Sequence, residues 1–600
     1  MNFECINDLV KDLSNKFNAA ESDINISLEI CPANMEGDFT VNCFRLTKVL
    51  KQKPDSIADA VLSFLNKHND VESANKIKAF VNFGLKSGVL YNNTLANVKT
   101  LLKNATLPDS AKHKILIEYS APNTNKPLHL GHLRNNTLGM ALCSLLERVG
   151  NEVFGVNLIN DRGIHICKSM IGYQRFGNDE TPETANKKGD HFVGDFYVLF
   201  DKELKRQIEE LKKSNPELSE KTDEELFPET EIGKAAQATL IKWENGDPEV
   251  IALWKKMNKW VLDGFSETYK RMGIDFTRVY LESDTYKLGK DIVLDGYKKG
   301  IFQKREDGAI YADLKPFKLT EKVLLRPDAT SVYITQDIGT TLMKYRDFHP
   351  DTQIWVVGDE QIHHFKTLFA LVKVLNYECS ENLHHLAYGM VNLPSGKMKS
   401  REGKVVDADN LFDDMQEFAK NATLERCGDN VPEDIDDRSE IIALGALKFM
   451  LLKFNPKTTI MFDPEASIKF EGDTGPYVQY VCARINSILS KAKAKHGDSI
   501  LDFSEINWSL LDSKWERKLA ILSAFYSNNL IAAAEKLDCS VLIGFLLNLA
   551  KAYNSFYREC PVLAAGNEEL IKARLALSSA VKDILADGLK TLTIRIPKAM

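Results

Sequence analysis

The chain has 600 residues, of which 44% are hydrophobic and 27% charged, and its formal net charge is −7. This composition is typical of a multidomain globular protein and excludes a globally basic one, so any nucleic-acid contact must use local basic patches. No apolar run reaches transmembrane length, the first ten residues are not a signal peptide, and ten cysteines without a C-x-x-C pair indicate reduced thiols in the cytoplasm and argue against a zinc site.

Residues 1 to about 110 are predicted to form a separate small α/β module. Apolar residues recur at helical spacing from Cys5 to Phe17 and lead into alternating strand patterns such as INISLEI. The segment GDFTVNCFRLTKVLKQKPDSIADAVLSFL follows, and the run Phe80–Phe83 closes the module.

Residues 112–175 are predicted to be one β–α–β unit. A buried strand at Ile115–Ile117 is followed by a proline-containing turn and then by HLGH (129–132), which opens an amphipathic helix. The next strand, Glu152–Ile159, ends in Asn-Asp-Arg-Gly. Asp161 in that segment either caps a helix or lies near a substrate, and both interpretations stay open.

The two histidines of HLGH lie at a strand-to-helix junction, where ligands bind in open parallel sheets. A helix N-terminus offers unpaired N–H groups to phosphate, and the imidazoles of His129 and His132 can donate to a phosphate whose charge grows in a transition state. Gly131 lets a flat base approach the backbone. HxxH alone is more often incidental or half of a metal site, but the context and the lack of a second His/Cys cluster favour phosphate.

Residues 176 to about 305 are predicted to form a helical insertion, because Lys- and Glu-rich runs such as KELKRQIEELKK are typical of solvated helix faces. From 306 to about 400 the strand and helix signals alternate again. Short strands are expected at Ala309–Ala312 and Ser331–Thr335, and a buried strand at Ile354–Gly358.

Two polar motifs stand in this second half. A phenol and a carboxylate at Tyr333 and Asp337 suit a guanidinium, which presents five donors in a planar fork; alternatively, Asp337 caps a helix and Tyr333 belongs to the core. The second motif is GKMKSREG (396–403), whose flanking glycines allow a loop to open and close. In isolation such a run is a solvated basic turn. Beyond 441 the chain is predicted to form a bundle of amphipathic helices.

Together these segments resemble one enzyme family. HLGH resembles the HIGH signature of class I aminoacyl-tRNA synthetases, and EYSAPNTNKPLHLGHLRNNTLG resembles its arginyl-tRNA synthetase version. GKMKS resembles the KMSKS loop, one residue short. Aligned on Lys-Ser, Lys399 takes the second-lysine place and Gly396 the first; aligned on Lys-Met, Lys397 takes the first. The first 110 residues, FEGDTGPYVQYVCARINSIL and AKAYNSFYREC resemble the family's terminal domains.

The resemblance implies an α/β fold: a Rossmann-like parallel sheet with a helical insertion, an N-terminal α+β module and a C-terminal all-α bundle. The implied domains are a tRNA-contacting domain (1–110), a catalytic domain (111–405) with its insertion at about 176–305, a connector (406–440) and an anticodon-binding domain (441–600).

The implied reaction is ATP-dependent activation of L-arginine to arginyl-adenylate and its transfer to the 3′ end of arginine tRNA, with release of pyrophosphate and AMP. ATP would enter with Mg²⁺, and no zinc is expected. The resemblance also implies a monomer that needs no membrane and whose activation step waits for tRNA.

The resemblance assigns residues to four sites. The implied catalytic residues are His129, His132 and Lys399. ATP-binding residues are Asn125, His129, Gly131, His132, Met390, Val391 and Lys399. The arginine pocket comprises Glu118, Asn123, Tyr333, Asp337 and Gln361, with Glu118 and Asp337 around one guanidinium. Candidates for the anticodon region are Tyr477, Tyr480, Arg484, Asn554 and Tyr557, each of which could instead belong to the bundle core or its rim.

Three other functions fit these residues less well. A class I synthetase for another amino acid is disfavoured, because cysteinyl enzymes need zinc ligands and because the Tyr333 motif with its carboxylates favours a cation. A non-catalytic RNA-binding protein is disfavoured by the intact His129, Gly131, His132 and Lys399. An adenylyltransferase that does not use tRNA would not need the two terminal domains.

Overall fold

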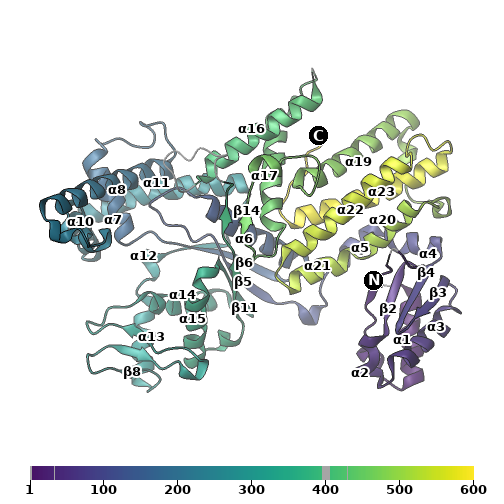
Figure 1. The fold of residues 1–600 in the computed structure, drawn as a ribbon, viewed down its shortest axis with the longest axis horizontal. Coiled ribbons are helices and arrows are strands. Elements are labelled where there is room, and N and C mark those ends of the chain that lie inside the picture. Colours follow the sequence, from purple (N-terminus) through teal and green to yellow (C-terminus); the bar gives the residue numbers. More distant parts are fainter. Residues whose placement is uncertain (1–2, 33, 395–405, 429) are drawn as a thin grey trace. The chain divides into compact units, whose positions relative to one another are not determined.

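The computed structural model describes residues 3–32, 34–394, 406–428 and 430–600. The chain divides into a central unit, residues 108–467, and a terminal unit, which joins residues 1–107 to residues 468–600 (Figure 1). None of the helices in the described ranges combines the length and the apolarity that a membrane crossing requires.

A five-stranded parallel sheet forms the centre of the central unit, in the order β12-β11-β5-β6-β7. Leu116, Ile117, Ile354 and Val356 in its middle strands are buried, as expected for a parallel sheet that helices cover on both faces. The predicted parallel α/β fold is therefore confirmed. The strands are β5 (Lys114–Glu118), β6 (Glu152–Ile159), β7 (Arg278–Leu281), β11 (Thr352–Gly358) and β12 (Leu383–Tyr388).

Strand β5 is the point at which the strand order reverses. Helix α6 (Leu130–Arg148) returns the chain from β5 to its neighbour β6, whereas the other neighbour, β11, follows a long excursion of the chain. Ligands bind in open parallel sheets at such a reversal, outside the carboxyl ends of the strands. Glu118 is the last residue of β5 and His129 directly precedes α6, so both lie at this edge.

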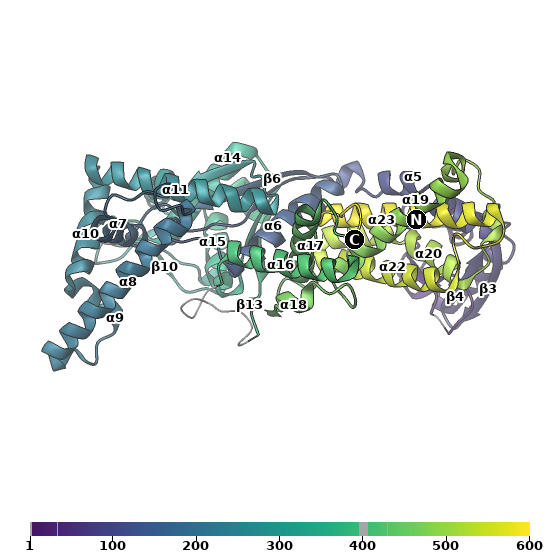
Figure 2. The ribbon, with the colours of Figure 1, turned by 90° about the horizontal axis from the view of Figure 1, so that it is seen from above.

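Between β6 and β7 the chain forms the helical insertion, in which α8 and α11 lie side by side (Figure 2). Strand β7 corrects the prediction of a wholly helical region up to about residue 305. This edge strand has a single buried residue, Tyr280, and its apolar run, Val279–Leu281, is too short to be told from the adjoining helices by its pattern. The helices are α7 (Ile164–Phe176), α8 (Gly189–Ser214), α9 (Asp223–Leu226), α10 (Glu231–Glu244) and α11 (Pro248–Met272).

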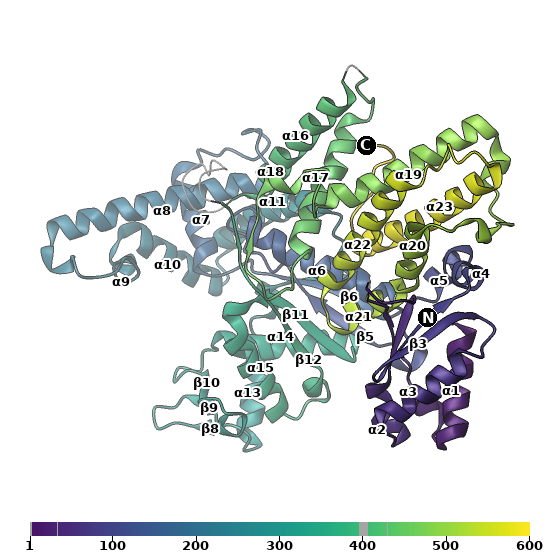
Figure 3. The ribbon, with the colours of Figure 1, turned by 45° about the vertical axis from the view of Figure 1, so that its right-hand side comes forward.

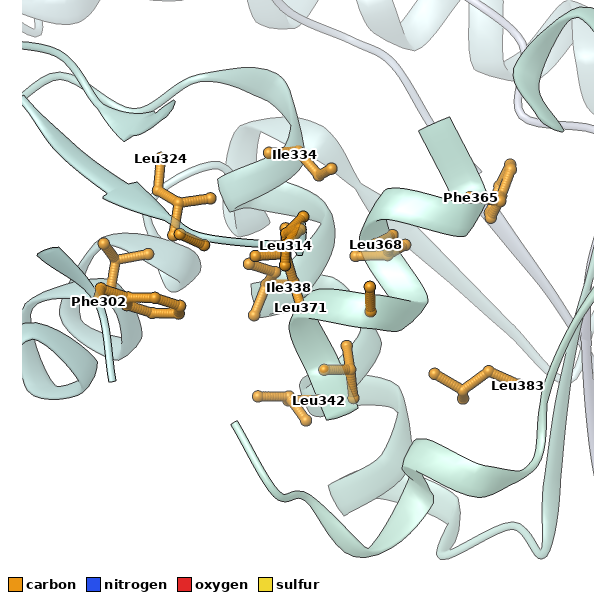
Figure 4. Close-up of a cluster of buried hydrophobic side chains, with 14 of the residues drawn as sticks. Phe302, Leu314, Leu324, Ile334, Ile338, Leu342, Phe365, Leu368, Leu371 and Leu383 are labelled. Atoms are coloured by element: carbon orange, nitrogen blue, oxygen red, sulfur yellow. The ribbon is translucent and has the colours of Figure 1, made fainter. Parts of the chain in front are cut away.

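After β7 the chain forms a small antiparallel sheet in the order β10-β9-β8, next to α13 (Figure 3). Its side chains share a buried core with α14 and α15, where Leu324 lies near Ile334 and Ile338 (Figure 4). The elements are α12 (Glu282–Thr285), α13 (Leu288–Lys298), β8 (Gln303–Lys304), β9 (Ile310–Ala312), β10 (Lys322–Leu325), α14 (Tyr333–Phe348) and α15 (Ile362–Val374).

The strand expected at Ser331–Thr335 is wrong, because α14 already begins at Tyr333. Val-Tyr-Ile-Thr favours a strand by composition, but the tertiary contacts decide otherwise. Thr335 is fully buried and its hydroxyl donates to the Leu324 carbonyl oxygen at 2.5 Å, which fixes the first turn of the helix against β10.

Helices α16 (Ala408–Cys427) and α17 (Ile435–Leu452) pack against α6 in the central unit. The segment expected to connect two domains, 406–440, is thus largely helical, and the central unit extends past residue 440. Short parallel strands β13 (Val391–Asn392) and β14 (Ile460–Met461) and helix α18 (Pro464–Ser467) complete it.

The terminal unit combines an antiparallel sheet, in the order β1-β2-β4-β3, with a bundle of five helices. The elements of its first part are α1 (Glu4–Phe17), β1 (Leu28–Ile30), β2 (Phe39–Asn42), α2 (Thr47–Leu50), α3 (Pro54–Leu65), β3 (Val71–Ile77), β4 (Phe80–Leu85), α4 (Ser87–Tyr91) and α5 (Val98–Lys103). The bundle comprises α19 (Gly475–His496), α20 (Lys514–Ala524), α21 (Tyr526–Glu535), α22 (Cys539–Glu559) and α23 (Glu568–Thr591).

An ion pair joins the two parts of the terminal unit. Arg517 of α20 donates from Nε and Nη2 to the buried carboxylate of Asp38 at 2.6 and 2.7 Å, and also to the Leu85 carbonyl oxygen at 2.6 Å. Such a bidentate pair is stronger and more directional than a single contact. Tyr91 also stacks on Trp508, with ring centroids 5.9 Å apart.

Candidate functional site

The histidine pair forms the cap of helix α6. The Nδ1 atom of His129, at the N-cap, accepts a hydrogen bond from the Gly131 N–H at 3.1 Å, and Nδ1 of His132 accepts from the His129 N–H at 3.1 Å. The ring centroids lie 3.9 Å apart. A Cβ at Gly131 would stand 3.0 Å from Cε1 of His129, so the missing side chain leaves room for the imidazole.

Burial sets the protonation state of both rings, and the capping hydrogen bonds set the tautomer. Burial, followed by the charge of Lys126, lowers the pKa of His129 to about 4. Burial, followed by the charges of His129 and Lys126, holds the pKa of His132 well below its ordinary value. Both rings are therefore neutral near pH 7. Because Nδ1 accepts in each, the ring proton resides on Nε2, which is left as a hydrogen-bond donor.

The turn that precedes the histidines is held by backbone hydrogen bonds to buried asparagines. Ser120 and Ala121 have positive φ angles of 78° and 47°, a conformation that non-glycine residues rarely adopt. The Ser120 N–H donates to Oδ1 of Asn135 at 2.6 Å, and the Ala121 N–H to Oδ1 of Asn157 at 2.9 Å. Strained turns fixed in this way are typical of functional sites.

Two predicted residues lie in the same turn. Asn123 pairs with Asn160 through an isolated parallel bridge at the end of β6. The buried Asn125 has a side-chain oxygen with no hydrogen-bond partner among the described residues. A buried acceptor of this kind calls for a donor that the described residues do not supply.

The structure gives Glu118 a partner that the sequence analysis missed. The ammonium of Lys344, on α14, forms an ion pair and hydrogen bond with the Glu118 carboxylate, and both side chains are buried. The Lys344 ammonium also lies 5.0 Å from the ring centroid of Trp355. The expected arrangement, in which Glu118 and Asp337 share one guanidinium, therefore has to accommodate a cation that Glu118 already holds.

Asp337 lies in the first turns of α14, and its carboxylate accepts from Nε2 of His364 at 2.7 Å. Tyr333, at the first position of that helix, has 80% of its surface exposed, so the alternative that it belongs to the core is wrong. Gln361 is exposed directly before α15. Tyr333, Asp337 and Gln361 are thus solvent-accessible, whereas Glu118 is not.

Glu282, which the sequence analysis did not single out, follows β7 at the same edge of the sheet. Burial raises its pKa to about 7; Arg162 opposes this effect, and the charges of Asp161 and Asp337 add to it. A second carboxyl group therefore lies within electrostatic reach of Asp337. The signal that could have revealed it is a Glu-Ser pair directly after a short strand.

Asp161 holds the residue that follows Glu282, Ser283. Its carboxylate accepts from the Ser283 N–H at 2.8 Å and from the Ser283 hydroxyl at 2.7 Å. The N-cap of α7 is Gly163, so Asp161 is not the cap of that helix. Of its two open interpretations, the structure thus contradicts the helix cap and places Asp161 next to Glu282.

The remaining predicted residues of the ATP site lie at or beyond the end of β12. Met390 is exposed, and Val391 is half-buried where β13 pairs with β14. The KMSKS-like segment with Gly396, Lys397 and Lys399 lies outside the described residues.

In the terminal unit, four of the five anticodon-region candidates come together. The Arg484 guanidinium donates to Oδ1 of Asn554 at 2.7 Å and lies over the rings of Tyr480 and Tyr557, 4.5 and 5.0 Å from their centroids. These side chains lie beside a cavity of about 730 Å³. Its lining includes Tyr480, Arg484 and Tyr557 together with three residues that were not predicted, Lys491, Arg558 and Met600. Tyr477 is half-buried on the same helix and does not line this cavity.

Three families of known domains match consecutive parts of the chain. Residues 4–85 match the arginyl tRNA synthetase N terminal domain, residues 94–463 the catalytic domain of tRNA synthetases class I (R), and residues 478–600 the DALR anticodon binding domain. The arginine--tRNA ligase of Treponema denticola is 43% identical over 580 residues, which cover 96% of this chain and 95% of that protein. The arginine--tRNA ligase of Bacteroides thetaiotaomicron is 42% identical, with 96% of each chain covered.

Solved structures agree with the sequence relatives. The arginyl-tRNA synthetase of Thermus thermophilus superimposes with a TM-score of 0.80 at 26% identity, and the alignment covers 100% of both chains. The Plasmodium falciparum arginyl-tRNA synthetase superimposes with a TM-score of 0.73 and shares the fold at 21% identity. With this fold, these motifs and relatives above 40% identity over nearly its whole length, the chain belongs to the arginyl-tRNA synthetases, the class I enzymes that ligate arginine to tRNA.

Proposed function

We propose that this synthetase forms arginyl-adenylate at the carboxyl edge of β5, with His129 and His132 donating from Nε2 to the phosphates of ATP. The observation that carries this assignment is that each Nδ1 already accepts a backbone N–H. Donors fixed before the substrate arrives stabilise the charge that develops on the phosphates without having to reorganise.

In the proposed reaction ATP enters as its Mg²⁺ complex and the arginine carboxylate attacks the α-phosphorus. The bond to pyrophosphate breaks, and the 3′-terminal adenosine hydroxyl of the tRNA then attacks the adenylate carbonyl and releases AMP. Catalysis here is positioning and charge stabilisation. We assign Asn125, Gly131, Met390 and Val391 to ATP, and Lys399 to the departing pyrophosphate by its place in the KMSKS-like motif.

The histidine assignment predicts a loss of rate without a loss of the helix cap. Asparagine is a good N-cap, so His129→Asn is expected to keep α6 intact while removing one donor. The kcat of arginine-dependent pyrophosphate exchange, measured with arginine tRNA present, should fall by about 10²-fold. The exposed His363→Asn serves as the matched control. Unchanged exchange by His129→Asn would rule out the assignment, and exchange without tRNA would rule out a tRNA-gated activation step.

For arginine we propose a pocket beside Asp337, in which His364 orients the carboxylate and Glu282 adds a second negative charge. A guanidinium offsets the cost of two neighbouring carboxylates and satisfies their hydrogen bonds. We assign the exposed Tyr333 and Gln361, together with Asn123, to the walls of this pocket. Glu118, which is paired with Lys344, would support the pocket from the end of β5.

The raised pKa of Glu282 makes arginine binding depend on pH. A bound guanidinium favours the carboxylate, so binding expels the proton that Glu282 carries below about pH 7. The KM for arginine is therefore expected to fall as the pH rises from 6 to 8, and Glu282→Gln should remove this dependence. Steady-state aminoacylation across that pH range measures it, with the exposed Glu267→Gln as control. Persistence of the slope in Glu282→Gln would contradict the assignment.

For tRNA we propose that the cavity around Arg484 takes unstacked anticodon bases. Its guanidinium and the rings of Tyr480 and Tyr557 offer flat faces for stacking, Asn554 can bond base edges, and Lys491 supplies charge for phosphate. Tyr477 stays a candidate for the adjoining surface.

We further propose that residues 1–110 contact the tRNA, that residues beyond 441 include the anticodon-binding domain, and that the synthetase is a cytoplasmic monomer without zinc. All ten cysteines are free and most are buried, which supports a reducing compartment.

A further inference from the structure

A cluster of charged side chains, Lys188, Asp190, His191, Asp407 and Asp409, lies between the helical insertion and the start of α16; we call it the 188–409 cluster. Lys188 Nζ lies 2.7 Å from Asp409 Oδ2 and 3.1 Å from Asp190 Oδ2. His191 Nε2 lies 2.9 Å from Asp409 Oδ2 and 3.5 Å from Asp407 Oδ2. Thr268 of α11 adds a hydrogen bond from its hydroxyl to Asp409 Oδ1 at 3.0 Å.

The cluster adjoins the backbone that carries the histidine pair. His129 and Asp407 form an antiparallel bridge. The Leu130 N–H donates to the Val406 carbonyl oxygen at 3.0 Å, and the Ala408 N–H to the Leu128 carbonyl oxygen at 2.9 Å. Asp407 in addition caps α16 by accepting from the Asn410 N–H at 3.0 Å. The two residues that flank His129 are therefore paired with the segment that Lys188 and His191 hold.

We propose that Lys188 and His191 are positioning residues for His129: they fix residues 406–409, whose backbone sets the place of the capped imidazole. This inference rests on the proposed role of His129 at the phosphates. The helical insertion, which supplies both cations, thereby contributes to the activation step without touching the substrate.

The charges explain why the cations are needed. Three carboxylates meet here, and Asp190 is fully buried. Without a cation, Asp190 and Asp409 would repel each other in a poorly solvated place, and the start of α16 would move away from α8. The ammonium of Lys188 supplies the positive charge that these carboxylates need, so we assign no metal to them.

His191 adds a dependence on pH. Burial lowers its pKa, but the hydrogen bond to Asp409 and the charges of Asp407 and Asp190 outweigh burial, so its pKa is raised. Lys188, with its ammonium against Asp190 and Asp409, is the other cation at this contact. As the pH rises through the raised pKa, the imidazolium loses its proton and the hold on residues 406–409 weakens. His129 and His132, whose pKa values are lowered, do not titrate in this range.

The experiment measures pyrophosphate exchange with the full-length chain, arginine and arginine tRNA. Lys188→Met is expected to lower kcat by at least about tenfold, as small misplacements of reacting groups do, with the KM for arginine changed less than about twofold. Lys188→Arg should restore most of the rate. The control is Lys187→Met, which removes a neighbouring exposed lysine paired with Asp195 and should leave kcat unchanged.

A second variant keeps the inference falsifiable if Lys188→Met folds poorly. The kcat of the unaltered chain is expected to fall as the pH rises above the raised pKa of His191, and His191→Gln is expected to abolish this alkaline fall. The inference would be overturned if Lys188→Met and Lys187→Met had equal rates, or if Lys188→Arg failed to restore the rate. It would also be overturned if the KM for arginine rose in Lys188→Met by as much as kcat fell, or if the pH profile of kcat were unchanged in His191→Gln. Full activity of His129→Asn would instead reject the histidine role itself, whatever the cluster variants do.

Discussion

Replacing Asp337 by asparagine is expected to lower kcat/KM for arginine by roughly 10⁴-fold, with the KM for ATP nearly unchanged. The change keeps the shape of the side chain and removes the charge that faces the guanidinium. It also leaves His364 without its carboxylate partner, which stands at 2.7 Å. Aminoacylation at subsaturating arginine gives the ratio directly.

The matched control for this loss is Asp328→Asn. Asp328 is an exposed loop residue whose carboxylate bonds only to its neighbour Thr330 among the contacts described. Its replacement should leave kcat/KM for arginine unchanged. A loss below tenfold for Asp337→Asn would place the guanidinium elsewhere, and the Glu118 end of β5 would then be the next position to test.

Removing Lys344 is expected to have the largest effect on stability. Lys344→Met leaves the Glu118 carboxylate buried without its cation, because only 1% of the Lys344 side chain and 10% of the Glu118 side chain are exposed. Breaking one partner of such a pair costs about 3–5 kcal/mol in the free energy of unfolding. Urea denaturation followed by circular dichroism measures the change.

The double variant Lys344→Met/Glu118→Gln tests the cause. If the loss comes from an uncompensated charge, the double variant should be more stable than Lys344→Met alone. An exposed pair provides the control: Lys373→Met, which breaks the contact with Glu381, should cost at most about 1 kcal/mol. Equal stability of Lys344→Met and Lys373→Met would show that the buried pair does not stabilise the central unit.

Three strands of the parallel sheet, β5, β6 and β11, and the start of α6 could be predicted from sequence because their determinants are local. The apolar run at Ile115–Ile117 predicts a buried strand, and HLGH predicts a helix start, whatever lies elsewhere in the chain. The Arg484 cavity could be predicted from local sequence only in part. Helical spacing brings Tyr480 and Arg484 to one face, but Asn554 and Tyr557 reach it from α22 through tertiary packing.

The partners within the pocket could not be predicted, because they depend on contacts between distant elements. Nothing in the letters around Lys344 indicates that its ammonium is buried against Glu118, on a strand far earlier in the chain. Glu282 was not predicted either, because it directly follows β7, a short edge strand that the sequence pattern does not indicate. The family resemblance predicts which residues belong to the pocket. It does not predict which charged side chains pair with one another, because that depends on the fold.

The pairing of Asp38 with Arg517 has a consequence for the order in which this chain folds. During synthesis the first sheet emerges with a carboxylate that is destined for burial, and its cation appears only when residue 517 has been made. Because long-range contacts form late and domains otherwise tend to fold as they emerge, the terminal unit cannot settle before the central unit has been synthesised. The nascent N-terminal module is therefore incompletely stabilised until the C-terminal helices have been synthesised.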